Sequence, residues 1–314
     1  MTTPRVSVVV PAHDAGQTLG RALAALAAQR VEGGFEVILV DDGSTDDTLA
    51  IARAAELPLT IVSGDRLGAA EARNRGVLEA RAQTLAFTDA DCEPAPEWLA
   101  AGLAALGSAD LVQGRVVPRP GEPLGPFDRT LWVEAARGFF ETANLFVTRE
   151  LFERLGGFEQ WVEMGGRPFG EDLWFGWRAV RGGARTSFEP RALVHHAVFP
   201  RGPLAFVDER RRLRHFPAIA RRVPEVRERM LYRRVFLTRR SAALDAALAG
   251  AALAAVRRSP VGLLAAAPYA WMVAKAARPY RRRAPLVAAV GVAADLTGCA
   301  AMLYGSLRFR SPVV

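Results

Sequence analysis

Residues 85–92 read Leu-Ala-Phe-Thr-Asp-Ala-Asp-Cys, an apolar run followed by two carboxylates that are separated by one residue. A short continuous apolar run of this kind, bounded by polar residues, is typical of a strand buried on both faces of a sheet. Asp89 and Asp91 would then lie at the carboxyl end of that strand. Because hard cations prefer carboxylate oxygens, the pair can hold a divalent cation beside an anionic ligand. The competing interpretation is a surface turn whose aspartates cap the helix near Pro96.

The sequence on both sides alternates between strand-like and helical patterns over the first 115 residues. The expected strands are 6–10, 35–40, 59–62, 85–88 and 111–117, and the expected helices are 18–29, 46–56, 69–80 and 96–106. This alternation predicts an α/β fold with a parallel sheet covered by helices on both faces. Ligands of such sheets bind at the carboxyl ends of the strands. Polar motifs follow three of these strands, at 11–14, 41–46 and 89–91, so we expect one ligand site there.

Residues 118–200 continue the mixed pattern after a loop rich in Pro and Gly. We expect helices at 127–137, 149–155 and 171–181, and strands at 142–147, 185–189 and 192–199. Glu171 and Asp172 open a helix directly after a glycine-rich segment. Acidic residues in a first helical turn also interact favourably with the helix dipole, so a purely structural role is the alternative for this pair.

The order of these motifs resembles family 2 glycosyltransferases of the GT-A fold, over roughly residues 5–200. The motifs are Pro11-Ala12-His13-Asp14, Asp41-Asp42-Gly43-Ser44, Arg73-Asn74, Asp89-Ala90-Asp91 and Glu171-Asp172. The resemblance implies a GT-A (Rossmann-like) nucleotide-diphospho-sugar transferase domain. It also implies a nucleotide-sugar donor, inversion at the anomeric carbon, and a divalent cation, Mn²⁺ or Mg²⁺.

Site residues follow from the same resemblance. The donor-binding candidates are Pro11, Ala12, Asp14, Asp41, Asp42, Arg73, Asp89 and Ala90. The metal candidates are Asp89, Asp91 and His196, although His196 could equally be a structural histidine. The family usually has an aromatic residue and then Asn where His13 and Asp14 stand, so the base bound by the donor site stays undefined.

The catalytic candidates are Asp172, as the general base that takes the proton of an acceptor hydroxyl, and its neighbour Glu171. A positioned base typically contributes about 10²–10⁴-fold to a rate. Asn144 and Trp174 are candidate acceptor contacts. For Trp174 and Trp177, one helical turn apart, packing in the core is the competing interpretation.

Charge is concentrated in one segment. Residues 201–240 hold 13 Arg and four acidic residues, so this segment has a net charge of +9. The whole chain has a net charge of +8, so the rest of the chain sums to about −1. Three apolar segments follow, 241–256, 259–274 and 284–307, and only the last reaches the ~20 residues of a helical span. We therefore expect a catalytic domain at 1–200, an arginine-rich juxtamembrane segment at 201–240 and membrane-associated helices at 241–314. A solvated helical face is the alternative for the charged segment.

This distribution favours an anionic membrane surface as the partner of residues 201–314, and not a nucleic acid. The expected location is the cytoplasmic face of the cell membrane, with the C-terminal helices as candidate spans. Two distant cysteines, Cys92 and Cys299, predict no disulfide framework.

The expected activity is transfer of a sugar to a hydroxyl of a lipid-linked or cell-envelope glycan. One alternative is a polyprenyl-phosphate sugar synthase, whose acceptor is already anionic and needs no base. Another, of a different class, is a non-catalytic membrane-bound nucleotide-sugar-binding protein. Residues 201–240 contain no Gln, so the Q-x-x-R-W motif usual in processive synthases is absent there, and we expect single or few additions.

Overall fold

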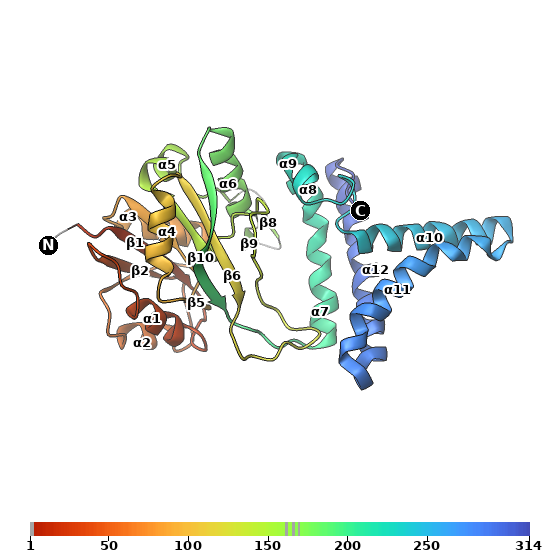
Figure 1. Ribbon diagram of the computed structural model, residues 1–314, viewed down its shortest axis with the longest axis horizontal. Coiled ribbons are helices and arrows are strands. Elements are labelled where there is room, and N and C mark those ends of the chain that lie inside the picture. Colours follow the sequence, from red (N-terminus) through yellow and green to blue (C-terminus); the bar gives the residue numbers. More distant parts are fainter. Residues whose placement is uncertain (1–2, 161–162, 165–166, 169) are drawn as a thin grey trace. The chain divides into compact units, whose positions relative to one another are not determined.

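The computed structural model describes residues 3–160, 163–164, 167–168 and 170–314. The chain forms two compact units, shown in Figure 1. Unit 1 comprises Met1–Pro123 and Thr130–Phe199, and unit 2 comprises Leu124–Arg129 and Pro200–Val314. A short loop from the middle of the sequence therefore belongs to the C-terminal unit.

An eight-stranded sheet forms the centre of unit 1. Its strands, in spatial order, are β3 (Leu59–Ser63), β2 (Phe35–Asp41), β1 (Val6–Ala12), β4 (Thr84–Phe87), β7 (Leu145–Thr148), β6 (Leu111–Pro118), β10 (Thr186–His196) and β5 (Cys92–Pro94). The α/β class is confirmed, and the five strands expected within the first 115 residues run in one direction, but the sheet as a whole is mixed. Strand β7 runs antiparallel to β4 and β6, and β5 runs antiparallel to β10.

The mixed direction follows from the connection between β6 and β7. Parallel neighbours need a crossover that returns the chain to the same end of the sheet, usually a helix. The helix expected at 127–137 is absent. Instead Val133 exchanges two backbone hydrogen bonds with Val116, at 2.9 and 2.8 Å, in an isolated bridge beside β6. The chain therefore enters β7 from the opposite end.

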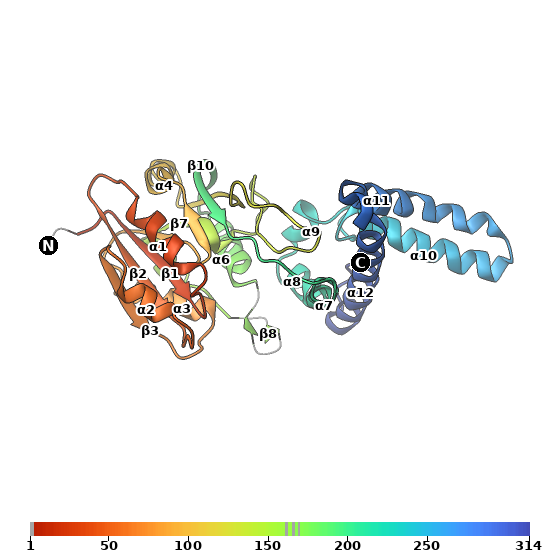
Figure 2. The same cartoon turned by 90° about the horizontal axis from the view of Figure 1, so that it is seen from below.

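Helices cover both faces of this sheet, as expected. They are α1 (Leu19–Ala27), α2 (Thr48–Arg53), α3 (Ala69–Glu79), α4 (Trp98–Leu106), α5 (Arg149–Arg154) and α6 (Glu171–Arg181), and Figure 2 shows them from a second direction. Successive side chains of a strand point to opposite faces. Ala86 thus joins the core formed with α1 and α4, whereas Phe87 packs against Phe152 and Phe158. Two apolar layers therefore hold the strand ends in place.

Strand β10 joins two runs that the sequence pattern separates. A register shift between Glu189 and Leu193 interrupts its pairing with β6, which explains why the pattern breaks there. Its end pairs with β5, a three-residue strand that the sequence pattern does not reveal, and this pairing places His196 opposite Cys92. In the remainder of unit 1, β8 (Glu163–Met164) pairs with β9 (Arg167–Pro168).

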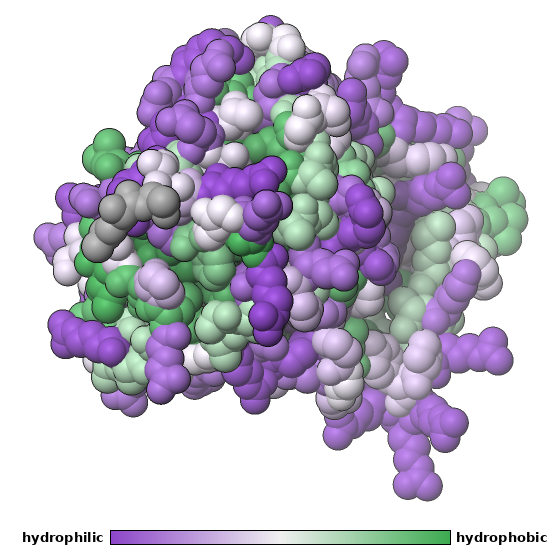
Figure 3. Space-filling view, turned by 60° about the vertical axis from the view of Figure 1, so that its left-hand side comes forward, coloured by the Kyte–Doolittle hydropathy of each residue, from purple (hydrophilic) through white to green (hydrophobic). Residues whose placement is uncertain are grey.

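Unit 2 is helical. Its elements are α7 (Pro203–Glu209), η2 (Arg210–His215), α8 (Phe216–Arg222), α9 (Glu225–Arg229), α10 (Arg239–Arg257), η3 (Pro260–Ala266), α11 (Ala267–Ala277), η4 (Arg278–Arg283) and α12 (Ala284–Phe309). All three apolar segments are helical, as expected. By length and composition, one helical stretch of the described chain, Pro260–Phe309, could cross a membrane. In the view of Figure 3, hydrophilic side chains are spread over the visible surface, with apolar side chains between them.

Candidate active site

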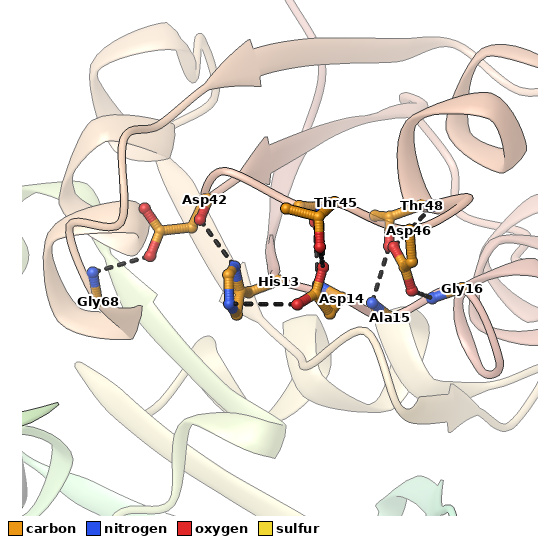
Figure 4. Close-up of polar contacts among 10 residues, drawn as sticks. His13, Asp14, Ala15, Gly16, Asp42, Thr45, Asp46, Thr48 and Gly68 are labelled. Atoms are coloured by element: carbon orange, nitrogen blue, oxygen red, sulfur yellow. Dashed lines mark hydrogen bonds and ion pairs between the residues drawn. The ribbon is translucent and has the colours of Figure 1, made fainter.

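The loops after β1 and β2 are tied together by two aspartates (Figure 4). Asp14, at a φ of 47°, accepts a 2.7 Å hydrogen bond from the backbone N–H of Thr45, and this bond lowers the pKa of its carboxyl. Asp46 accepts from the backbone N–H groups of Gly16, at 2.8 Å, and Thr48, at 3.0 Å. Asp14, a candidate donor contact, therefore has one carboxylate oxygen engaged in joining the two loops.

Asp41 and Asp42 at the end of β2 have different environments. Asp42 accepts from the backbone N–H groups of Leu67, at 2.6 Å, and Gly68, at 2.8 Å, so both of its oxygens hold the turn before α3. Asp41 is buried, and within the described residues its Oδ1 has no hydrogen-bond partner. A buried polar atom without a partner is uncommon. Asp41 is thus the better placed of the two to accept a hydrogen bond from a ligand.

Arg73 connects two predicted parts of the site. Its buried guanidinium donates a 2.6 Å hydrogen bond to Oδ1 of Asp89, and its other terminal nitrogen lies 3.6 Å from Oε1 of Glu171. The strand end after β4 and the first turn of α6 are distant in sequence but share this one cation. Glu171 therefore holds Arg73, which is a positioning role.

The two carboxylates of the Asp89-Ala90-Asp91 motif are divided between different partners. Asp91 Oδ2 lies 3.5 Å from Nε2 of His196, and Cys92 is close enough for the ligand atoms of all three to lie within 4.8 Å of one another. His196 Nδ1 is 2.6 Å from the carbonyl oxygen of Ala197. Because a carbonyl only accepts, Nδ1 carries the proton and the lone pair of Nε2 faces Asp91.

The carboxylate oxygen of Asp91 suits Mn²⁺ or Mg²⁺, and the oriented histidine has the hydrogen bond to a carbonyl that metal-ligating histidines usually make. The fully buried Cys92 contributes little here, because burial strongly raises the pKa of its thiol. Among the described residues, Asp89 is hydrogen-bonded to Arg73 and does not belong to the cluster of Asp91, Cys92 and His196. The geometry therefore favours Asp91 and His196 as the cation-holding pair.

Asp172 lies in the first turn of α6 and is half-buried. Burial raises the pKa of its carboxyl well above the usual value, and the like charges of Glu171 and Glu141 raise it further. Its Oδ1 accepts a 2.7 Å hydrogen bond from the backbone N–H of Leu173. A carboxylate whose pKa is raised toward the working pH is a better general base than an ordinary aspartate.

Sequence reasoning missed Glu141. Burial raises the pKa of this carboxyl too, and the buried Gln113 of β6 donates a hydrogen bond to its Oε2. The only signal in the sequence is an acidic residue directly before an apolar run. Its effect on Asp172 depends on the antiparallel return of β7, which the sequence pattern did not predict.

The two candidate acceptor residues are placed differently. Asn144 is fully buried, accepts a 2.8 Å hydrogen bond from the indole N–H of Trp98, and donates to the carbonyl oxygens of Arg115 and Ala192. This placement corrects the expectation of an acceptor contact, because every amide hydrogen is used inside the fold. Trp174 donates to Oε2 of Glu159 at 2.8 Å and keeps an accessible surface, so it stays a candidate.

Trp177 belongs to the core. It is buried, donates to the carbonyl oxygen of Gly138 at 2.9 Å and packs edge-to-face on Phe140. Pro11 and Ala12 end β1 beside Asp41, and Ala90 is buried between the motif's aspartates.

Known proteins show the same architecture. Residues 7–159 match the family described as glycosyl transferase family 2. Glycosyltransferase AglE of Haloferax volcanii is 29% identical over 65% of this chain and 70% of its own length. Validoxylamine A glucosyltransferase of Streptomyces hygroscopicus is 39% identical, but over 32% of this chain and 25% of its own length.

Among solved structures, mannosyltransferase PcManGT from Pyrobaculum calidifontis, in complex with GDP-Man and Mn²⁺, superposes with a TM-score of 0.65. The match covers 94% of this chain and 87% of that one, at 26% identity. GalNAc-T7, solved with UDP, GalNAc and Mn²⁺, shares the fold at a TM-score of 0.51, 20% identity, 64% of this chain and 45% of that one. Motif order, sheet topology and these matches agree: residues 7–159 belong to the glycosyl transferase family 2, and the chain has the GT-A fold of these glycosyltransferases.

Proposed function

We propose that this glycosyltransferase moves a sugar, with inversion, from a nucleotide-diphosphate donor to a hydroxyl of a lipid-linked or cell-envelope glycan. The observation that carries the proposal is the contact of Arg73 with both Asp89 and Glu171. Through this residue the strand end assigned to the donor and the turn that holds Asp172 lie together. The two halves of a transfer reaction need this proximity.

Asp172 is the proposed base. Its carboxylate takes the proton of the acceptor hydroxyl while that oxygen attacks the anomeric carbon in line. The bond from that carbon to the diphosphate oxygen breaks, so the configuration inverts and the nucleotide diphosphate leaves with the bonding electrons. A polyprenyl-phosphate acceptor would need no such base, so an Asp172 whose pKa is raised favours a hydroxyl acceptor.

Asp91 and His196 would hold the divalent cation. When bound, it supplies positive charge that stabilises the departing diphosphate. Asp41 would accept from the nucleotide, because its Oδ1 is buried and, among the residues described, has no partner. The Mn²⁺ and nucleotide-sugar bound by PcManGT support a similar requirement in this chain.

The membrane location rests on unit 2. Its exposed arginines and apolar helices suit an anionic bilayer surface, and a lipid-linked acceptor would be presented there. We place the enzyme at the cytoplasmic face of the cell membrane.

A donor screen tests the proposal. UDP-, GDP- and dTDP-sugars are added with and without Mn²⁺, and thermal unfolding is followed. A ligand at 100 times its Kd stabilises the folded state by about 2.7 kcal/mol. We expect one donor class to stabilise the protein only with the cation, and Asp91→Ala to lose that dependence. Asp208→Ala, at an exposed aspartate of unit 2, is the matched control.

Donor stabilisation that is equal with and without Mn²⁺ would contradict the metal assignment. A donor that binds but is never transferred to any hydroxyl acceptor would instead favour the non-catalytic alternative.

A further inference from the structure

The turn at 155–159 and helix α6 form one body. Arg178 of α6 donates a hydrogen bond to the carbonyl oxygen of Gly157, and its guanidinium lies 2.9 Å from Oε1 of Glu159. Trp174, one turn earlier in the same helix, donates to Oε2 of Glu159 at 2.8 Å. Both oxygens of this carboxylate are thus bound to the helix, so the turn and α6 keep a fixed relation to each other.

Phe158 lies in this turn, and its ring packs between β4 and α6. The centroid of the ring is 5.2 Å from that of Phe87, at the end of β4, and 4.7 Å from that of Phe175 in α6. Phe175 follows Asp172 by about one helical turn, and all three aromatic rings are buried. Among the described helices and strands, none packs its backbone closely along α6. Side-chain contacts such as these therefore decide where the proposed base lies.

Asn74 of α3 holds the backbone of Phe158. Its amide nitrogen donates to the carbonyl oxygen of Phe158, and its amide oxygen accepts from the N–H of the same residue, both at 2.9 Å. Gly157 permits this approach, because a Cβ there would lie 2.7 Å from the amide oxygen of Asn74. Two hydrogen bonds to one residue fix its direction as well as its distance.

The preceding residue, Arg73, holds α6 at a second point. It donates to Asp89 at 2.6 Å and lies 3.6 Å from Glu171 in the first turn of α6. Helix α3 is itself fixed to the donor side, because Asp42 accepts from both N–H groups of the turn before it. Consecutive residues of one helix thus join the donor side to the helix of the base, one through charge and the other through a neutral amide.

We propose that Asn74 is a positioning residue for sugar transfer, which sets Asp172 against the donor side of the site. It acts through the rings of Phe158 and Phe175. Within the described chain its hydrogen bonds go to Phe158 and, at 3.4 Å, to Glu71, and to none of the candidate donor or metal residues. The inference rests on the proposed function, because it takes Asp172 as the base.

The expected signature is a loss of rate without a loss of donor binding. A misplacement of about 1 Å can cost ~10²-fold in rate even when the changed residue is remote from the chemistry. We therefore expect Asn74→Ala to lower kcat by about 10–10²-fold. Its donor affinity should stay nearly unchanged, because the donor candidates keep their own contacts.

Turnover is measured as release of nucleoside diphosphate from UDP-, GDP- and dTDP-sugars with Mn²⁺. Water serves as the acceptor, since the base would take its proton as it would that of a hydroxyl. Donor affinity is measured by thermal unfolding with the same sugar nucleotides. Asn74→Gln is a milder second variant. It keeps the amide but lengthens the side chain, so the paired bonds form only with the turn displaced, and kcat should fall with a smaller loss of melting temperature than in Asn74→Ala.

Gln29→Ala is the matched control. Gln29 of α1 is also a buried amide that ties two segments together: it donates to the carbonyl oxygen of Ala95 at 2.8 Å and accepts from the N–H of Leu99 at 3.2 Å. It lies with α1 and α4, on the other face of the sheet from the ring of Phe158. We expect Gln29→Ala to lower the melting temperature as Asn74→Ala does, but to keep kcat.

Backbone hydrogen exchange tests the placement of α6 without any substrate. In Asn74→Ala, exchange should become faster in residues 155–160 and 171–177 and stay unchanged in β1 and β2. In Gln29→Ala, exchange in residues 171–177 should stay as in the wild-type protein. This measurement separates the inference from the proposed function. Wild-type protein that releases no diphosphate from any of the sugar nucleotides would count against the proposed function, and hydrogen exchange would still decide whether Asn74 holds α6.

Three results would overturn the inference. Unchanged exchange of α6 in Asn74→Ala would show that other contacts hold the helix. Faster exchange with an unchanged kcat would reduce Asn74 to a structural residue. Equal losses of kcat in Asn74→Ala and Gln29→Ala would attribute the effect to general destabilisation of unit 1.

Discussion

At the scale of single residues, burial decides what the carboxylates of the site can do. Asp42 and Asp14 are held by backbone N–H groups and maintain loops. Asp172 is half-buried, and its partial burial and the like charges of Glu171 and Glu141 raise the pKa of its carboxyl, which favours a role as a base. Side chains of the same chemistry therefore have different functions because their surroundings differ.

Asp172→Asn should abolish transfer, with a loss of about 10²–10⁴-fold, while donor affinity stays nearly unchanged. It should also stabilise the fold at neutral pH. The folded state binds the Asp172 proton more tightly than the unfolded state does. Protonated Asp172 therefore contributes to the stability of the fold, and this contribution is complete below pH 3.8, the ordinary aspartate pKa, which applies to the unfolded chain. The contribution is lost as the pH rises through the higher pKa of the folded state, so the charged carboxylate destabilises the fold at neutral pH.

Transfer assays, donor titrations and melting temperatures at several pH values check this prediction. Retained transfer would refute the base assignment, and a melting temperature that falls at neutral pH would refute the electrostatic argument.

Glu141→Gln should shift the acidic limb of the pH–kcat profile to lower pH. The charge of Glu141 disfavours the ionised form of Asp172, so its removal lowers the pKa of that carboxyl. The isosteric amide can keep a hydrogen bond with Gln113. Glu150→Gln, at an exposed helical glutamate, is the control and should leave the profile unchanged. An unchanged pH–kcat profile in Glu141→Gln would show that the charge of Glu141 does not raise the pKa of the catalytic base.

At the scale of elements, the sheet positions the site through its antiparallel members. Pairing of β5 with β10 brings Cys92 opposite His196, and so sets Asp91 beside the imidazole. The core beneath these strands depends on close packing of α4. Within α4, Gly102 lies against the ring of Phe146 on β7.

Gly102→Ala should destabilise unit 1 by about 1–3 kcal/mol, because a Cβ there would overlap the buried Phe146 ring. Gly20→Ala in α1 is the matched control. Its Cβ would lie 3.7 Å from Ile51, an ordinary contact, and alanine is the better helix former by roughly 0.5–1 kcal/mol. Chemical denaturation measures the free energy of unfolding of both variants. The argument fails if Gly102→Ala is as stable as the wild-type protein.

At the scale of the whole molecule, the residues proposed for catalysis and the helices proposed to bind a membrane lie in different units. Motif residues of the active site all lie in unit 1, whereas the arginine-rich segment and the apolar helices lie in unit 2. Positive surface charge attracts a protein to an anionic bilayer, but high salt screens this attraction. Binding through apolar surface persists at high salt.

Deletion of residues 241–314 should release the protein from membranes in high salt, because only the screened attraction of the arginines would remain. Sedimentation with vesicles at low and high ionic strength measures this, and thermal unfolding with donor checks that unit 1 is still folded. A truncated protein that sediments equally with membranes at high salt would show that the apolar helices are not the anchor.

The local sequence was sufficient for the α/β class, the helices α1 to α6, the strand-end motifs and the family. These features depend on hydrophobic periodicity and on short motifs, which are properties of neighbouring residues. The exact extent of α6, 171–181, was predicted because glycines border it on both sides. The charge asymmetry between the two ends of the chain was likewise visible without a structure.

Contacts between distant residues were decided only by the folded chain. The antiparallel direction of β7, the absence of a helix at 127–137 and the structural role of Asn144 all depend on which strands become neighbours. The same holds for the division of Asp89 and Asp91 between Arg73 and His196, and for the proximity of Glu141 to Asp172. A residue type and its spacing indicate what chemistry is available. Burial and the partners supplied by other elements determine which of those residues is left to perform it.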